Sequence, residues 1–436
     1  MRCCSNCGHL PVTTRAQKRK ASGDWRIDWP AKVLVIICVL NLNGVVSMMF
    51  DQGGAVSLLM LGTASILVLA AGRRVWSLPF ALLFLAIVSY LLFGALFYDP
   101  LLSVEAPGKY YRAYGGALLI LWGLAGYVAR LEPGPRLDGF LAFVRNVFLL
   151  SAASVWASPI LYEYYVNLPF SFQQRMGGFF GNPNEAAMVS VLAVALTLAL
   201  PFRSKLIQIA ALAMAGTAVF MTFSKTGMVC LVIVLAWHLV RAARGIGLVI
   251  LTLGMLVVIL FLQDAEGILI AIVDSPMLDL DEHQRGRVLA VGQILSGQID
   301  ETTSTGRTYL WRLVIERALN DFPLGSGLGS AHHIIGGVLE HDAWQGAHNT
   351  FLMIWSESGV LPLLLLIAAM GSAALSSLRY VRSRLELTCL FVLLVNMIVS
   401  HMSLALRYHN VMLAIIFGLL AGVSWRYAKK RSRRRI

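Results

Sequence analysis

The sequence predicts an all-α, polytopic integral membrane protein with about 12 transmembrane helices and one large outer loop that contains short helices. Hydrophobic residues make up 58% of the 436 residues and charged residues only 14%, against roughly 45–50% and 25% in soluble domains. Apolar runs recur along the chain, many near the ~20 residues that a transmembrane helix needs. Short basic clusters separate these runs, which is the pattern of cytoplasmic loops in membrane proteins.

The first part of the chain is a basic tail followed by nine predicted spans. Residues 1–29 are polar and basic, and residues 30–263 hold the spans. Arg73 and Arg74 close the second span, and a Pro- and Gly-containing breaker cluster separates the fourth span from the fifth. The predicted spans are residues 31–50, 53–72, 78–97, a fourth that ends at Val128, 139–160, 185–201, 206–223, 227–240 and 245–263.

One long polar segment, residues 264–347, interrupts the spans. Within it Arg307–Asn320 is expected to be an amphipathic helix, because apolar residues recur at i, i+3 and i+4 and Pro323 follows. Residues 348–426 hold three further spans, and residues 427–436 are a basic tail. These last predicted spans are residues 350–376, 387–404 and 410–426.

The distribution of charge predicts the orientation. With twelve spans both termini lie on one side, and the basic clusters between spans fall on that side too. By the positive-inside rule this side is the cytoplasm, so the long loop is expected outside. That loop holds twelve Asp and Glu against five Arg and no Lys. The net charge of +13 therefore indicates topology and contact with membrane lipids, and no nucleic-acid partner is expected.

Two cations stand at the outer ends of predicted spans, where ionisable residues are costly and functional by default. Arg175 lies in the glycine-rich loop Gln173–Asn184, whose glycines let backbone approach a ligand closely. In that loop Asn182 and Asn184 flank a proline, and Asn184 could cap the sixth span. The alternative is a structural turn that only needs Gly and Pro. Lys225 directly follows the seventh span, and its alternative role is an interfacial lysine that reaches toward headgroups.

A third cation, Arg307, opens the expected helix of the long loop. The helix dipole disfavours a cation in the first turn, so Arg307 either pairs with an acid or faces an anion. The glycine-rich segment Asp321–Ser330 follows that helix. It lacks the Gly-Lys-Ser/Thr of a phosphate-binding P-loop, and we interpret it as a flexible connector or a backbone nest.

Four histidines lie within seventeen residues of the chain: His332, His333, His341 and His348. Their spacing fits neither a His-Glu-x-x-His site nor a compact finger, so neither a metal nor another cofactor is expected. His348 is the sharpest candidate, because it stands where the loop re-enters the membrane and a neutral imidazole can take a proton from a sugar hydroxyl. The alternative is that His348 only caps the next helix. Asn349 follows it, and Glu357 lies within the tenth predicted span.

Four motifs occur in a recognisable order. They are Arg-x-Gly-Gly-Phe-Phe-Gly-Asn-Pro-Asn at 175–184, Ser-Lys-Thr-Gly at 224–227, Gly-Arg-Thr-Tyr-Leu-Trp-Arg at 306–312 with Pro-Leu-Gly-Ser-Gly-Leu-Gly at 323–329, and His-Asn-Thr-Phe-Leu-x-x-x-x-Glu-x-Gly at 348–359. Together they resemble the O-antigen ligase and O-antigen polymerase superfamily of bacterial inner-membrane glycosyltransferases, most clearly from about 170 to 370.

The resemblance implies a multi-pass inner-membrane enzyme of polysaccharide biosynthesis, with both termini cytoplasmic and the long loop periplasmic. The enzyme would move a glycan from undecaprenyl diphosphate to an acceptor hydroxyl by an inverting, metal-independent reaction. In ligases, which we favour here, the acceptor is the lipid A–core of lipopolysaccharide. In O-antigen or exopolysaccharide polymerases it is another glycan.

The resemblance also implies roles for single residues. His348 matches the loop histidine proposed as the base, and Arg175 and Arg307 match cations expected near the donor diphosphate. Lys225 stands where the family usually has arginine, and it keeps the charge but loses the bidentate geometry. Supporting roles are expected for four further residues, namely Asn182, Asn184, Asn349 and Glu357.

Two other classes of function stay open at this point. A polysaccharide or lipid transporter or flippase would need ionisable residues spread through the middle of several spans. Here they gather at the outer face, apart from Glu357 and Arg145. A structural assembly subunit without activity is the third class.

Overall fold

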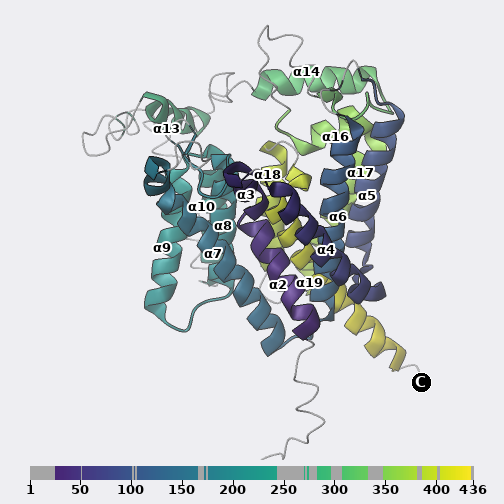
Figure 1. The fold of residues 1–436 in the computed structure, drawn as a ribbon, viewed down its shortest axis with the longest axis horizontal. Helices are drawn as coiled ribbons and strands as arrows, with labels where there is room; N and C mark the ends of the chain where they lie inside the picture. Colours follow the sequence, from purple (N-terminus) through teal and green to yellow (C-terminus); the bar gives the residue numbers. More distant parts are fainter. Residues whose placement is uncertain are drawn as a thin grey trace, which may run out of the picture.

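The computed structural model is a bundle of α-helices with one short two-stranded hairpin (Figure 1). Within the described residues it confirms the predicted all-α membrane class. It describes residues 25–50, 52–100, 103, 106–164, 171–172, 175–242, 270, 273, 282–295, 307–331, 347–380, 385–399 and 403–433.

The described elements follow the predicted spans closely in most places. In the first half they are α2 (Trp25–Val39), α3 (Leu42–Phe50), α4 (Gly53–Ala71), η1 (Gly72–Val75), α5 (Leu78–Leu96), α6 (Pro107–Arg130), α7 (Pro135–Tyr164), β1 (Ser171–Phe172) and β2 (Arg175–Met176). In the second half they are α8 (Pro183–Ala199), α9 (Lys205–Met221), α10 (Lys225–Ala242), α13 (Glu282–Leu295), α14 (Arg307–Asn320), α16 (Thr350–Ser358), α17 (Val360–Tyr380), α18 (Leu385–Val399), η2 (Ser403–Ala405) and α19 (Arg407–Arg433).

Five described helices are long and apolar enough to cross a membrane, namely α4, α5, α7, α17 and α19. Three shorter apolar helices, α8, α9 and α18, accompany them. The ninth predicted span, residues 245–263, lies outside the described residues. The number of about twelve spans therefore stays a prediction, as do the predicted boundaries of the loop and tails.

Two predicted spans are broken. The span 31–50 is interrupted between α2 and α3, where Asn41 has a φ of +49° and its side-chain amide donates to the carbonyl of Phe179 (3.0 Å). The span 350–376 is divided into α16 and α17 at Gly359, which has a φ of +83°. A Cβ on Gly359 would lie 2.2 Å from the carbonyl oxygen of Pro323. In both places a tertiary contact accompanies a left-handed residue that an unbroken helix cannot contain.

The centre of the bundle is built from helices whose small residues allow close packing. α6 and α19 lie against each other. A Cβ on Gly418 of α19 would lie 2.7 Å from the carbonyl oxygen of Ala125 of α6, and one on Gly422 would lie 3.2 Å from that of Ala129. Small residues four apart on both helices therefore set their separation, as is common between membrane helices.

α8 is the most completely covered helix near the candidate site. Its buried residues run from Pro183 to Thr197 with few interruptions, and it contacts α7, α9, α10 and α18. A helix that is apolar on all sides can be covered by other helices or by lipid, and α8 is covered by other helices. By contrast, α4, α5, α9 and α17 expose large apolar side chains, as expected of surfaces that face lipid.

The two ends of the bundle differ (Figure 1). α13 and α14 lie at one end, which we call the loop end. The first turn of α2 and the last turns of α19 lie at the opposite end, which we call the tail end. Asn41 follows the far end of α2, so its contact with Phe179 places the glycine-rich loop 175–184 at the loop end.

Candidate active site

Arg175 joins the glycine-rich loop to the turn that holds Lys225. It lies on β2, and the residue is only 4% exposed. Its Nε donates to the carbonyl of Thr222 (2.8 Å), and its Nη2 donates to Oδ1 of Asn184 (3.0 Å). A buried guanidinium needs such partners because the loss of hydration is costly. The loop, the start of α8 and the turn before α10 are thus tied together by one cation.

The turn 222–225 has a constrained backbone. Phe223 has a φ of +48°, and the flanking Thr222 and Ser224 are fully buried. The Oγ of Ser224 accepts from the N–H of Gly227 (3.2 Å), which caps the first turn of α10. Lys225 is the half-buried first residue of that helix. A non-glycine residue at positive φ is uncommon and is concentrated at functional sites, where surrounding contacts hold it.

The capping of α8 differs from the prediction. Asn182 is the N-cap, with an extended backbone (φ −110°, ψ 115°), and its Oδ1 accepts from the N–H of Asn184 (2.9 Å). The residue before Pro183 is confined to the extended region, and that is the backbone an N-cap requires. The prediction that Asn184 caps α8 was therefore wrong, and Asn184 instead accepts from Arg175.

His348 is held in a strained turn just before α16. Its φ is +48° and it is half-buried. The N-cap of α16 is Asn349, whose Oδ1 accepts from the N–H groups of Phe351 (3.1 Å) and Leu352 (3.3 Å). The alternative that His348 itself caps the helix is therefore wrong. The cap of Asn349 fixes the start of α16 directly after His348.

The helix that begins at Arg307, α14, contacts the segment that holds His348. This helix has the predicted bounds, and it packs on α16. The indole N–H of Trp311 donates to the carbonyl of Ala347 (2.8 Å), directly before His348. Arg307 lies one helical turn before Trp311, and residues four apart share a helix face. The chain therefore places the predicted cation and the predicted base on neighbouring segments.

Glu357 is a buried structural acid. The hydroxyl of Tyr90 donates to its Oε2 (2.6 Å), and the backbone N–H groups of Gly329 and Ala331 also donate to this carboxylate. The glycine-rich segment thus forms a backbone nest around this buried carboxyl group. Its residues 326–331 are all buried, so the alternative of a flexible connector is wrong.

The same segment fastens α16 to α5. The N–H of Gly327 donates to the carbonyl of Glu357 (2.9 Å), and the N–H of Leu328 donates to that of Gly94 (2.8 Å). Gly327 has a φ of +93°, and a Cβ there would lie 2.3 Å from the carbonyl oxygen of Phe97. These contacts explain why position 327 needs glycine. They also anchor α16, the helix that follows His348, to α5.

A buried polar cluster at the junction of α18 and α19 was missed by the sequence reasoning. Asn396 donates to the hydroxyl of Tyr408 (3.2 Å) and contacts Nε2 of His409. The ring of Tyr408 packs edge-on against Phe180 of the glycine-rich loop, with centroids 5.6 Å apart. α18 also contacts both α8, which begins beside Arg175, and α16, which follows His348. The sequence signal of this cluster was a set of polar residues inside or at the ends of apolar runs.

Arg145, which the sequence placed within a span, has a structural role at the tail end. Its Nη1 donates to the carbonyl of Leu200 at the end of α8, and its guanidinium lies 3.5 Å from the ring centroid of Phe202. Among the described residues, no group of three or more His, Cys, Asp or Glu side chains could hold a metal ion. His332, His333 and His341 lie outside the described residues.

Comparison with known proteins gives one match. Residues 209–367 match a family model described as O-antigen ligase, which confirms the resemblance based on the motifs. The matched range contains Lys225, Arg307, His348 and Glu357, and Arg175 precedes it. No curated protein and no solved structure matches the chain. The apolar helices and this partial match together suggest an integral inner-membrane protein with ligase- or polymerase-type activity.

Proposed function

We propose, from the O-antigen ligase match over residues 209–367, that this protein is a ligase that transfers a glycan from undecaprenyl diphosphate to a hydroxyl of lipid A–core. The transfer takes place at the loop end, which we assign to the periplasm. The observation that carries the proposal is the bond from Trp311 to Ala347, because it joins the helix of Arg307 to the segment of His348.

The chemistry needs a base and cations. The acceptor hydroxyl gives its proton to His348, and its oxygen attacks the anomeric carbon from the face opposite the diphosphate. The bond from the anomeric carbon to the diphosphate oxygen breaks, and undecaprenyl diphosphate leaves with the electron pair. Attack from the opposite face inverts the configuration. The negative charge that develops on the leaving group is stabilised by fixed cations.

The cations have different tasks in this proposal. Arg307 lies near His348 through α14 and contacts the donor diphosphate. Lys225 supplies a second positive charge from the start of α10. Arg175 uses two of its N–H groups to hold the Lys225 turn and Asn184, so it adds charge and also positions the turn. Asn182 and Asn349 act through the helices that they cap, and Glu357 acts through the glycine-rich segment.

A polymerase of the same superfamily is the second candidate, because the chemistry at the donor is identical and only the acceptor differs. A transporter is less well supported. The sequence placed two ionisable residues, Arg145 and Glu357, within spans, and both have hydrogen-bond partners inside the protein.

His348→Ala tests the base directly. In cells that lack the native gene, we expect this variant to reach the membrane in normal amounts but to lose glycan transfer by about 100-fold or more, the size of a general-base contribution. Transfer is measured with purified enzyme, a lipid-linked glycan donor and lipid A–core. A second lipid-linked glycan as acceptor distinguishes polymerase from ligase.

Matched controls are available in the same loop. His332→Ala, His333→Ala and His341→Ala change the same residue type, and each should retain transfer. Normal transfer by His348→Ala would remove His348 as the base. Absence of transfer to either acceptor by the unaltered protein would contradict the proposed function as a whole.

A further inference from the structure

A cavity of about 290 Å³ lies at the tail end, away from the candidate active site. Its walls come from the last turns of α8 and α10 and the first turn of α18. α8 begins beside Arg175 and is 17 residues long, so its last turn lies roughly 25 Å from that site. The volume is near the lower limit of ligand pockets, which start at roughly 300 Å³. It suits one headgroup rather than an oligosaccharide.

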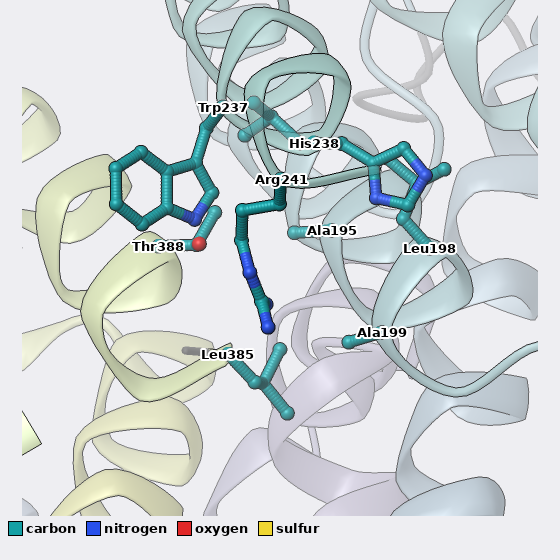
Figure 2. Close-up of a pocket in the computed structure, with 9 residues that line it drawn as sticks. Ala195, Leu198, Ala199, Trp237, His238, Arg241, Leu385 and Thr388 are labelled. Carbon is teal, nitrogen blue, oxygen red and sulfur yellow. The ribbon is translucent and has the colours of Figure 1, made fainter. Parts of the chain in front are cut away.

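Polar groups that can donate hydrogen bonds lie around this cavity. The lining includes Trp237, His238, Arg241 and Thr388. Figure 2 shows the Arg241 side chain extending through the middle of the cavity, with Trp237 and Thr388 on one side and Ala195 and Ala199 on the other. None of the described residues that line the cavity is acidic. The nearest acid along α18 is Glu386, which is buried and is not part of the lining.

A structural role for Arg241 alone does not account for this arrangement. A basic residue in the last turn of a helix interacts favourably with the helix dipole. That interaction explains why a cation is tolerated at the end of α10. It does not explain a guanidinium that reaches into a cavity beside an indole and a hydroxyl.

Apolar residues around the cavity make it suitable for a lipid. The remaining lining is apolar, with Ala195, Leu198, Val234 and Leu385 among it. Outside the lining, α10 carries other exposed apolar residues, such as Leu235 (46% exposed). Basic pockets between transmembrane helices on the cytoplasmic side bind anionic headgroups, and Trp is enriched at the membrane interface.

We propose that this cavity binds the phosphate of an anionic glycerophospholipid from the leaflet at the tail end, with Arg241 as the principal contact. Thr388 and the indole of Trp237 lie beside the phosphate position, and an acyl chain follows the exposed apolar surface of α10. The site is separate from glycan transfer, and its test needs neither donor nor acceptor.

The test is lipid retention by the purified full-length protein, measured by native mass spectrometry. Dioleoylphosphatidylglycerol is added in one arm and dioleoylphosphatidylcholine in the other. We expect the unaltered protein to retain phosphatidylglycerol preferentially. Arg241→Gln should weaken that retention by roughly tenfold, as for one charge-assisted hydrogen bond. Thr388→Val should weaken it by roughly threefold.

The matched control is Arg203→Gln, which removes an exposed arginine from the turn between α8 and α9 at the same end. It should retain phosphatidylglycerol normally. Equal losses in Arg203→Gln and Arg241→Gln would overturn the proposal, as would equal retention of the two lipids. A third arm adds inorganic phosphate alone. Displacement of the lipid by millimolar phosphate would show a site for free anions and would also overturn it.

Discussion

Arg175 and Lys225 carry the same charge, but the protein holds them in different ways. Arg175 is almost fully buried, and its planar guanidinium reaches a carbonyl and an amide at the same time. An ammonium group cannot reproduce that fork. Lys225 is half-buried at the start of a helix, on a flexible stem. We therefore propose that Arg175 both positions its neighbours and supplies positive charge, and that Lys225 supplies positive charge alone.

At the residue scale, this difference predicts how Lys225 responds to substitution. Lys225→Arg should retain most glycan transfer, because it keeps the charge and restores the residue usual in the family. Lys225→Gln should lower kcat by roughly tenfold, since one cation that stabilises the leaving group is lost. The measurement is a kinetic comparison of the two variants with equal amounts of folded protein. If Lys225→Gln transferred glycan as well as Lys225→Arg, the charge of Lys225 would have no part in the reaction.

At the scale of elements, α16 is a short helix held at both ends. Asn349 caps its start, and Gly359 ends it with a left-handed backbone. The glycine-rich segment bonds to Gly94 of α5, and Tyr90 of α5 donates directly to Glu357 of α16. This support holds α16, the short helix that directly follows the His348 turn, outside the apolar span of α17. If His348 is the base, as we propose, this support matters, because misplacement of a catalytic group by about 1 Å can cost ~100-fold in rate.

Gly359→Ala tests this support. The added Cβ would meet the carbonyl oxygen of Pro323 at 2.2 Å, at a φ of +83°. We expect a loss of about 1–3 kcal/mol of stability from the strained backbone, and a fall in glycan transfer with it. Thermal unfolding in detergent and the transfer assay together measure both effects.

Gly371→Ala on α17 is the matched control. A Cβ there meets nothing within 4 Å, and alanine favours helix. Its unfolding temperature should stay the same or rise slightly. An equal loss of stability in Gly359→Ala and Gly371→Ala would mean that the break after α16 is not a structural requirement.

At the scale of the whole molecule, two candidate sites lie at opposite ends of the bundle. The candidate catalytic residues lie at the loop end, and the cavity around Arg241 lies near the tail end. Among the described residues, the basic turn at Arg203 and Lys205 lies at the tail end, and by the positive-inside rule we expect that end to face the cytoplasm. The donor diphosphate and the anionic lipid would then be bound on opposite sides of the membrane.

This orientation can be measured by cysteine labelling in a variant that lacks its six native cysteines. In spheroplasts, a membrane-impermeant maleimide should label Asn320→Cys at the exposed end of α14. It should label Arg203→Cys, in the exposed turn between α8 and α9, only after the membrane is permeabilised. The reverse pattern would place the candidate site in the cytoplasm and contradict periplasmic transfer.

The sequence by itself determined the membrane class, the approximate positions of most described helices and the bounds of α14. These follow from the local pattern of apolar and charged residues, because a lipid-facing helix must be apolar over its whole length. The motif residues Lys225, Arg307 and His348 were also found from the sequence, because short motifs keep their order along the chain. Their roles stay predictions.

Only the tertiary structure decided which of these residues meet. The breaks at Asn41 and Gly359 and the pairing of Arg175 with Thr222 all involve partners distant in sequence. The same is true of the polar cluster around Asn396 and of the cavity at Arg241. The pattern of apolar residues determines which segments form helices, but it does not determine which helices pack together. A binding site is formed by side chains from helices that pack together, so only the tertiary structure reveals it.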